Sequence, residues 1–171
     1  ETVQGEGGIR VASDAWLAQL QELCHKHDVL FIVDDIQMGC GRTGTFFSFE
    51  GAAIVPDIIT LSKSLSGYGL PFSLVLMKPE LDQWKPGEHN GTFRGHNLAF
   101  VTARAAIEKY WSDYTFSHEI REKGAYMFER LIHIQSSLSD HKLVVRGKGM
   151  VFGLDCHETA IAKAICKAAF D

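Results

Sequence analysis

Residues 29–34 read Val29-Leu30-Phe31-Ile32-Val33-Asp34, a run of five apolar residues that ends in an acid. An unbroken apolar run of this length is typical of a strand buried on both faces of a parallel sheet. A helical pattern lies before it between Trp16 and Cys24, with Ser13 or Asp14 as the expected N-cap. This order predicts an α/β fold with a mostly parallel sheet flanked by helices.

Two further strand patterns follow the run, at residues 57–61 and 72–77. Residues 98–111 then carry apolar side chains on more than one face, which predicts a well-buried helix. From Phe116 to Leu138 the apolar residues step by three or four, which predicts one long amphipathic helix with a single apolar stripe.

The last part of the chain predicts a strand pair and a helix. Residues 142–146 and 150–156 read as strands on either side of Gly147-Lys148-Gly149, and a final helix begins near Glu158. A soft boundary falls near residues 112–115. We interpret the sequence as an internal segment of a larger protein, because it opens within a motif and its final helix has no stop signal.

Composition excludes several classes of protein. The chain has 171 residues, 46% of them hydrophobic and 22% charged, with a net charge of −4, which is typical of a globular protein. Without a basic patch or tail, nucleic acid and anionic membrane are not expected as partners. No apolar run reaches the roughly 18 residues of a membrane-spanning helix.

Cysteine and histidine spacings give no sign of a metal site. The four cysteines show no CxxC spacing and the eight histidines no HExxH spacing. We therefore expect free thiols in a reducing cytoplasm.

Asp34 and Lys63 are the main candidate functional residues. Lys63 lies in Thr60-Leu61-Ser62-Lys63-Ser64-Leu65-Ser66-Gly67, a stretch of small residues that leaves room for a planar cofactor. An acid at a strand end and a lysine in a Ser/Gly loop suit pyridoxal phosphate, because the acid holds the pyridine nitrogen protonated and the lysine forms the Schiff base. Gln37 could then hydrogen-bond the ring hydroxyl. Alternatively, Asp34 is a turn residue or a partner of Arg42, and Lys63 is an ordinary surface lysine.

A nucleotide-binding module is the alternative from a different class. Gly39, Gly41 and Gly44 form a literal G-x-G-x-x-G after the predicted strand. Two observations oppose it: Asp34 and Asp35 would repel a pyrophosphate, and residues 45–49 have a poor pattern for the required helix.

Residues 91–97 offer a hydroxyl and backbone donors just before a helix, where anions bind well. Thr92 is the candidate anion ligand in this stretch. The alternative is a plain loop-to-helix cap with Asn97 as the capping residue.

Five segments in the same order resemble the class III (ω-amino acid) aminotransferases of PLP fold type I. They are residues 1–8, Asp34-Asp35-Ile36-Gln37 with Gly41-Arg42-Thr43-Gly44, residues 56–63, Gly91-Thr92-Phe93, and Arg146-Gly147-Lys148-Gly149-Met150. The resemblance implies pyridoxal 5′-phosphate as cofactor. It also implies that residues 1–114 are part of the large PLP-binding domain, and that 115–171 are a linking helix and the truncated start of a small C-terminal α+β domain.

The resemblance also implies roles for individual residues. Lys63 would bond to the cofactor and carry the proton, Asp34 would pair with the pyridine nitrogen, and Gln37 would contact the ring hydroxyl. Thr92 would bind the cofactor phosphate of a neighbouring subunit, which implies a homodimer or a larger homo-oligomer. Glu6 would be a gate carboxylate that pairs with a late arginine and frees it for the α-carboxylate of glutamate.

Residues 64–71 and 82–95 resemble one branch of this family, which moves the amino group of glutamate onto aspartate 4-semialdehyde. Related enzymes that act on GABA, ornithine or diaminobutyrate for another pathway are alternatives, as is an inactive scaffold. The family more often has glutamate where this chain has Asp35. Because other parts of the family's site lie outside the 171 residues, we expect this segment alone to be inactive.

Overall fold

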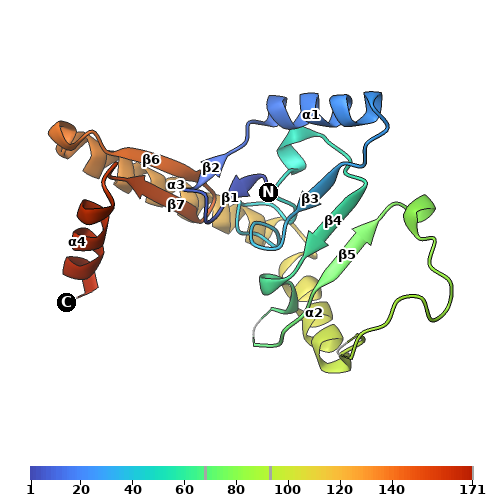
Figure 1. The fold of residues 1–171 in the computed structure, drawn as a ribbon. Coiled ribbons are helices and arrows are strands. Elements are labelled where there is room, and N and C mark those ends of the chain that lie inside the picture. Colours follow the sequence, from blue (N-terminus) through green and yellow to red (C-terminus); the bar gives the residue numbers. More distant parts are fainter. Residues whose placement is uncertain (68, 93, 171) are drawn as a thin grey trace.

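The computed structural model describes residues 1–67, 69–92 and 94–170 (Figure 1). Tyr68 and Phe93, which belong to stretches quoted above, and the C-terminal Asp171 lie outside the described residues. The helices are α1 (Asp14–Lys26), α2 (Asn97–Tyr110), α3 (Thr115–Ser137) and α4 (Thr159–Phe170). The strands are β1 (Val3–Gln4), β2 (Arg10–Val11), β3 (Ile32–Asp34), β4 (Ile58–Leu61), β5 (Leu74–Met77), β6 (Val144–Lys148) and β7 (Val151–Asp155). Four single-turn 3₁₀ helices complete the fold: η1 (Glu50–Ala52), η2 (Lys63–Ser66), η3 (Pro79–Leu81) and η4 (Ser139–His141).

The strands form three small sheets joined by helices, which confirms the α/β class (Figure 1). The central sheet has the order β3-β4-β5. β3 and β4 are parallel, as predicted, whereas β5 runs antiparallel to β4. β1 pairs with β2, and β6 with β7, in antiparallel fashion. The strand pair predicted around residues 147–149 is therefore confirmed as the β6–β7 hairpin, although Gly147 and Lys148 belong to β6 and the turn lies at Gly149 and Met150.

β3 begins later than the apolar run that predicted it. The backbone N–H of Phe31 donates to the Asp57 side chain at 2.7 Å, so the ladder with β4 starts only at Ile32. Asp57 also forms a 2.6 Å ion pair with Lys78, which lowers the pKa of the carboxyl group. A side chain 26 residues away thus sets where the strand starts.

The sheet has one buried face and one exposed face among the described residues. Val33 is 4% exposed, whereas its neighbour Ile32 is 53% exposed. The prediction of a strand buried on both faces is therefore wrong for this segment, because no described element covers the face of Ile32. The other face packs under α1 and η1 in the main core, which contains Leu17, Phe31, Val33, Phe49, Ala52 and Ile54.

Helix α1 begins where its cap was predicted. The backbone N–H of Trp16 donates to Ser13 Oγ at 3.2 Å, so Ser13 is the N-cap. Leu17 is buried in the main core. His25 and Lys26 occupy the last turn, where positive charge favours the helix dipole.

Helix α2 has the predicted position but not the predicted burial. Ala99 and Ala103 are buried, whereas the larger Leu98 and Val101 are exposed. Its small-residue side faces η2, where a Cβ on Gly67 would lie 3.1 Å from Ala106 Cβ. The apolar pattern correctly predicted the helix, but no other described element packs against the side of α2 that carries Leu98 and Val101.

Helix α3 joins the central part of the molecule to the β6–β7 hairpin through a close contact of backbones. A Cβ on Gly124 would lie 2.4 Å from Gly149 O, and one on Gly149 would lie 2.4 Å from the carbonyl carbon of Thr43. The N–H of Met150 donates to Arg42 O at 2.8 Å. We call the contact of Gly124, Gly149 and Thr43 the glycine junction.

We expect Gly124→Ala to destabilise the protein by about 1–3 kcal/mol, the usual cost of adding a methyl group where no space exists. The reason is that the methyl group meets backbone atoms, which cannot rotate away as a side chain can. Urea unfolding of the purified protein measures this change. Gly91→Ala is the control, because the atom nearest its Cβ is Arg94 Cβ at 3.9 Å. Equal stability of the two variants would contradict a tight junction.

Candidate active site

Asp34 and Lys63 follow neighbouring parallel strands at the same edge of the sheet. Asp34 ends β3 and pairs in register with Thr60 of β4. The N–H of Asp35 continues the ladder by donating to Thr60 O at 2.9 Å. Lys63 comes two residues after β4 ends. Ligands of α/β proteins bind at such carboxyl ends of parallel strands.

The backbone of Lys63 is held in a conformation that lysine rarely adopts. Its φ is +48°, in the left-handed region where residues other than glycine, asparagine and aspartate are strained. Side chains on both sides secure the turn: Ser62 Oγ donates to Phe72 O, and Ser66 Oγ to Leu70 O, each at 2.6 Å. Strain that the surroundings maintain is common at functional sites.

Lys63 and Gln37 line one cavity of about 290 Å³, the smaller of two described here. Its other walls come from four segments of the chain: Gly5, Ile9, Met38, Arg42, Ser64, Met150 and Val151. A Cβ on Gly5 would overlap Gln37 Oε1, so any larger residue there would displace the flexible end of the Gln37 side chain. The volume is near the lower end of ligand pockets, which span roughly 300–1,000 Å³.

Asp34 lies beside this cavity rather than in its lining. Its carboxylate is exposed and accepts a hydrogen bond from the N–H of Ile36 at 3.0 Å. It forms no ion pair with any cation of the described residues, Arg42 included. Across the ladder, Thr60 Oγ1 is buried and has no hydrogen-bond partner within the described ranges. The amine of Lys63, the amide of Gln37, the carboxylate of Asp34 and the hydroxyl of Thr60 thus belong to residues at or just after the carboxyl ends of β3 and β4. This set of donors and acceptors fits a polar planar cofactor.

Asp35, next to Asp34, is buried and hydrogen-bonded. From sequence it was noted only as a departure from the family pattern. It has 0% exposure and accepts hydrogen bonds from the N–H of Ser48 at 3.0 Å and from its hydroxyl. Burial raises the pKa of Asp35, the bonds from Ser48 oppose that rise, and the nearby charge of Asp34 adds to it. Ser48 in turn bonds the Thr2 hydroxyl at 2.5 Å, which ties the chain's first strand to the site.

Glu6 and Thr92 lie outside the lining of the cavity. Glu6 is exposed in the loop of residues 5–9, whose two ends, Gly5 and Ile9, line the cavity. Thr92 is exposed at the end of the segment 82–92, which follows η3 and extends from the body of the molecule (Figure 1). The structure therefore places Lys63, Gln37 and Asp34 at or just after the carboxyl ends of β3 and β4, Glu6 on a loop whose ends line the cavity, and Thr92 outside that lining.

A second cavity of about 410 Å³ lies next to the first and shares Arg42, Ser64 and Met150 with it. Its remaining walls are mostly apolar and aromatic: Cys40, Gly41, Phe46, Leu65, Gly67, Ala106, Ile107, Tyr110, Trp111, Phe116 and Ile120. Burial, and secondarily the charge of Asp35, raises the pKa of Cys40 to about 11.

The G-x-G-x-x-G glycines serve packing in this structure. Gly41 and Gly44 lie within a tight turn, closed by the N–H of Cys40 donating to Phe46 O at 2.7 Å, and no α-helix begins there. A Cβ on Gly41 would lie 2.9 Å from Ile120 Cδ1, and one on Gly44 would lie 3.1 Å from Arg121 Cγ, so both glycines admit α3. The nucleotide-binding alternative lacks the helix N-terminus that would hold a pyrophosphate.

Comparison with known proteins gives a consistent picture. The family described as "Aminotransferase class-III" matches residues 1–171. Diaminobutyrate–2-oxoglutarate transaminase of Bordetella parapertussis is 60% identical over 172 residues, and that of Halomonas elongata 57% over 173, each covering 100% of this chain. The chain spans 40% and 41% of those two relatives' lengths.

Solved structures agree with the family match. Acetylornithine aminotransferase from Elizabethkingia anophelis aligns with a TM-score of 0.83 and 37% identity, over 97% of this chain and 42% of that one. Ornithine δ-aminotransferase of Plasmodium falciparum aligns with a TM-score of 0.80 and 34% identity, over 90% and 40%. Within the described residues, every helix is too short or too polar to cross a bilayer.

We expect Asp35→Asn to gain stability relative to wild type as the pH rises from about 4. A raised pKa means that the folded protein holds this proton more tightly than the unfolded chain. The carboxyl group therefore stabilises the fold below the ordinary pKa of 3.8 and loses that contribution as the pH rises through the raised value.

Urea unfolding of both proteins across this pH range measures the difference. Asp57→Asn is the control, for which the stability difference should change with pH in the opposite direction. The pKa of Asp57 is lowered on folding, so its contribution to stability is lost as the pH falls. A constant difference between wild type and Asp35→Asn would show that Asp35 does not titrate differently on folding.

We expect Cys40 to resist alkylation at pH 8, because its pKa of about 11 leaves little thiolate. Its labelling by iodoacetamide should be about a hundredfold slower than that of an ordinary thiol with a pKa near 8.5. Peptide mass mapping measures the rate, with the exposed Cys166 as the internal comparison. Both should label readily in urea, and fast labelling of Cys40 in the folded protein would contradict the shift.

Proposed function

Because this chain belongs to the class III aminotransferases, we propose that the full-length protein transfers the amino group of L-glutamate to L-aspartate 4-semialdehyde. The products are L-2,4-diaminobutyrate and 2-oxoglutarate, and the reaction serves ectoine biosynthesis. The observation that carries the chemistry is the shared cavity of Lys63 and Gln37 beside Asp34. Identities of 57–60% to enzymes named for this reaction support the substrate assignment.

Pyridoxal 5′-phosphate is the proposed cofactor. When bound, it supplies an electron sink that stabilises the carbanion left when an amino acid loses its Cα proton. Asp34 would hold the pyridine nitrogen protonated, since its carboxylate is free of any described cation. Gln37 would hydrogen-bond the ring hydroxyl, and Thr92 would bind the phosphate. The unpaired Thr60 hydroxyl across from Asp34 supports a polar ligand at this edge.

Lys63 would have two roles in the reaction. Its amine would be the nucleophile that attaches to the cofactor aldehyde, and after release it would move a proton between the substrate's Cα and the cofactor. A proton carrier has to stay within reach of both positions. The secured turn around Lys63, with bonds from Ser62 and Ser66, limits the range of that amine.

Glu6 would control which substrate carboxylate is accepted. We propose that its carboxylate pairs with an arginine when the substrate presents an ω-amine, and releases that arginine for the α-carboxylate of glutamate. The position of its loop supports this role, because Gly5 and Ile9 line the Lys63 cavity on either side of Glu6.

A homodimer or larger homo-oligomer is the proposed assembly, in the cytoplasm. Thr92 lies outside the lining of both cavities of its own chain. A phosphate ligand that is remote from its own Lys63 would serve the site of a neighbouring subunit.

Among other ω-amine substrates, ornithine is the second candidate, since ornithine and acetylornithine aminotransferases are the structural neighbours. Their 34% and 37% identities are well below the 60% of the diaminobutyrate enzyme. A panel of 2,4-diaminobutyrate, ornithine, acetylornithine and GABA with 2-oxoglutarate separates these functions, and a preference for ornithine would overturn the first assignment.

We expect Lys63→Ala in the full-length enzyme to lower kcat with glutamate by at least about a thousandfold, because nucleophile and proton carrier are lost together. Coupled assay of 2-oxoglutarate release measures turnover, and the Schiff-base absorbance band of the purified protein should disappear. Lys123→Ala is the control, since Lys123 is exposed and pairs only with Glu119. Retained turnover in Lys63→Ala would end the assignment.

A further inference from the structure

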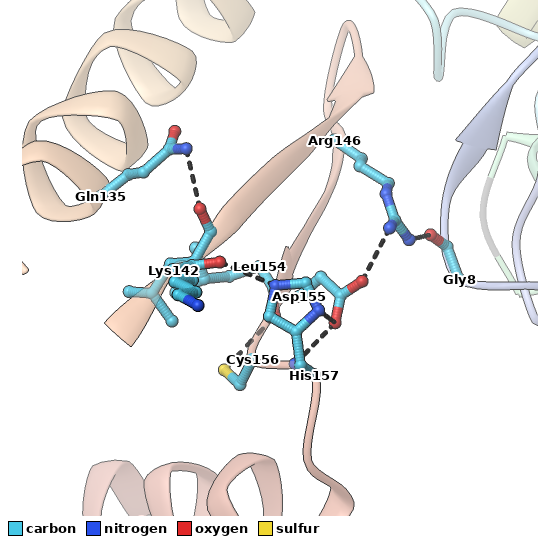
Figure 2. A network of polar contacts seen from close by, with 9 residues as sticks. Gly8, Gln135, Lys142, Arg146, Leu154, Asp155, Cys156 and His157 are labelled. Atoms are coloured by element: carbon cyan, nitrogen blue, oxygen red, sulfur yellow. Dashed lines mark hydrogen bonds and ion pairs between the residues drawn. The ribbon is translucent and has the colours of Figure 1, made fainter. Parts of the chain in front are cut away.

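The loop that carries Glu6 is attached to a distant part of the chain through Arg146 (Figure 2). Arg146 Nη1 donates to the carbonyl of Gly8 at 3.2 Å, across 138 positions of sequence. Its Nη2 forms a 2.7 Å ion pair with Asp155 Oδ2. One guanidinium group therefore joins the loop of residues 5–9 to strand β7.

Register explains why these groups meet on one face of the β6–β7 hairpin. Arg146 pairs directly with Gly153, and Asp155 lies two residues further along β7. Cross-strand and diagonal neighbours share a face in an antiparallel pair. Because Gly153 has no side chain, Ile9 fills the space opposite Arg146, and a Cβ at Gly153 would lie 2.9 Å from Ile9 Cγ1.

Asp155 is itself held in place. Its Oδ1 accepts a hydrogen bond from the N–H of His157 at 2.8 Å (Figure 2). This bond, and to a lesser degree the charge of Arg146, lowers the pKa of Asp155. The carboxylate is therefore ionised at neutral pH and keeps the guanidinium directed at Gly8.

Stability alone gives little reason for this arrangement. The Arg146 and Asp155 side chains are 34% and 30% exposed, and ion pairs with solvent access contribute little to stability. The loop, in contrast, contains three glycines, and Gly8 has a φ of +90°. Its base is closed by the β1–β2 pairing and by the N–H of Ile9, which donates to Gln4 O at 3.0 Å, while Arg146 holds the Gly8 carbonyl from outside this hairpin. Ile9 at its end has a φ of +52°, which apolar branched residues rarely adopt.

We propose that Arg146 is a positioning residue for Glu6, and that through it the β6–β7 hairpin sets the discrimination between glutamate and the ω-amine substrate. This inference rests on the proposed function of Glu6. Arg146 would touch neither substrate nor cofactor. It would fix the backbone of the loop from which the Glu6 side chain extends.

The first test measures the loop itself, without turnover. Hydrogen exchange of the peptide spanning residues 3–11 in the full-length enzyme should be about tenfold faster in Arg146→Ala, as expected for a lost charged hydrogen bond. Arg104→Ala is the matched control, because Arg104 pairs with Glu108 on exposed α2. Unchanged exchange in Arg146→Ala would overturn the proposal.

The second test separates the two half-reactions. In single-turnover measurements, Glu6→Gln should raise the ratio of kcat/KM for glutamate to kcat/KM for diaminobutyrate by about tenfold. Arg146→Ala should shift this ratio in the same direction, Arg146→Lys should shift it less, and the double variant should shift it no further than Glu6→Gln alone. An equal loss in both half-reactions, or additive effects, would mean a merely structural role.

The outcomes distinguish this inference from the proposed function. Turnover retained in Lys63→Ala would refute the proposed function, and no ratio change in Glu6→Gln would refute the proposed role of Glu6, on which this inference rests. Suppose that Lys63→Ala loses turnover and Glu6→Gln shifts the ratio of the two kcat/KM values as expected. An unshifted ratio in Arg146→Ala would then refute only the role of Arg146.

Discussion

The backbone contact at the glycine junction is the constraint on which the site depends. Gly124 of α3 packs on the backbone of Gly149 in the β6–β7 turn, and Gly149 packs on the backbone of Thr43, at distances that leave no room for a Cβ on either glycine. The junction places Arg42 and Met150 side by side, joined by a 2.8 Å hydrogen bond. Both residues form walls of both cavities. A shift of α3 by the width of one methyl group would therefore change the shape of the space around Lys63.

Local sequence patterns were sufficient to predict the elements that are determined by residues close together in the chain. The Ser13 cap of α1, the long helix α3 and the β6–β7 hairpin follow from apolar spacing, capping and turn chemistry, and all three were predicted. Asp34, Lys63 and Gln37 were predicted from sequence as site residues, and the structure places them at or just after the carboxyl ends of β3 and β4. Their catalytic roles remain predictions.

The features that sequence reasoning missed depend on distant residues. The start of β3 is set by Asp57, and the buried carboxylate of Asp35 receives its hydrogen bonds from Ser48. The contact of Arg146 with Gly8 spans almost the whole chain. A spacing rule cannot detect such pairs because nothing in the local pattern records them. The G-x-G-x-x-G motif failed for the related reason that glycines serve close packing as well as ligand binding, and only the neighbouring helix distinguishes the two.

The positive φ of Lys63 costs local stability, whereas the proposed reaction requires a lysine at this position. Asparagine and glycine tolerate this backbone conformation better than lysine does, whereas a long cationic side chain gains nothing from it in the folded state. Laboratory evolution that selects only for resistance to heat should therefore replace this lysine early and remove the proposed chemistry. Libraries selected for thermostability need a screen for the proposed activity at every round.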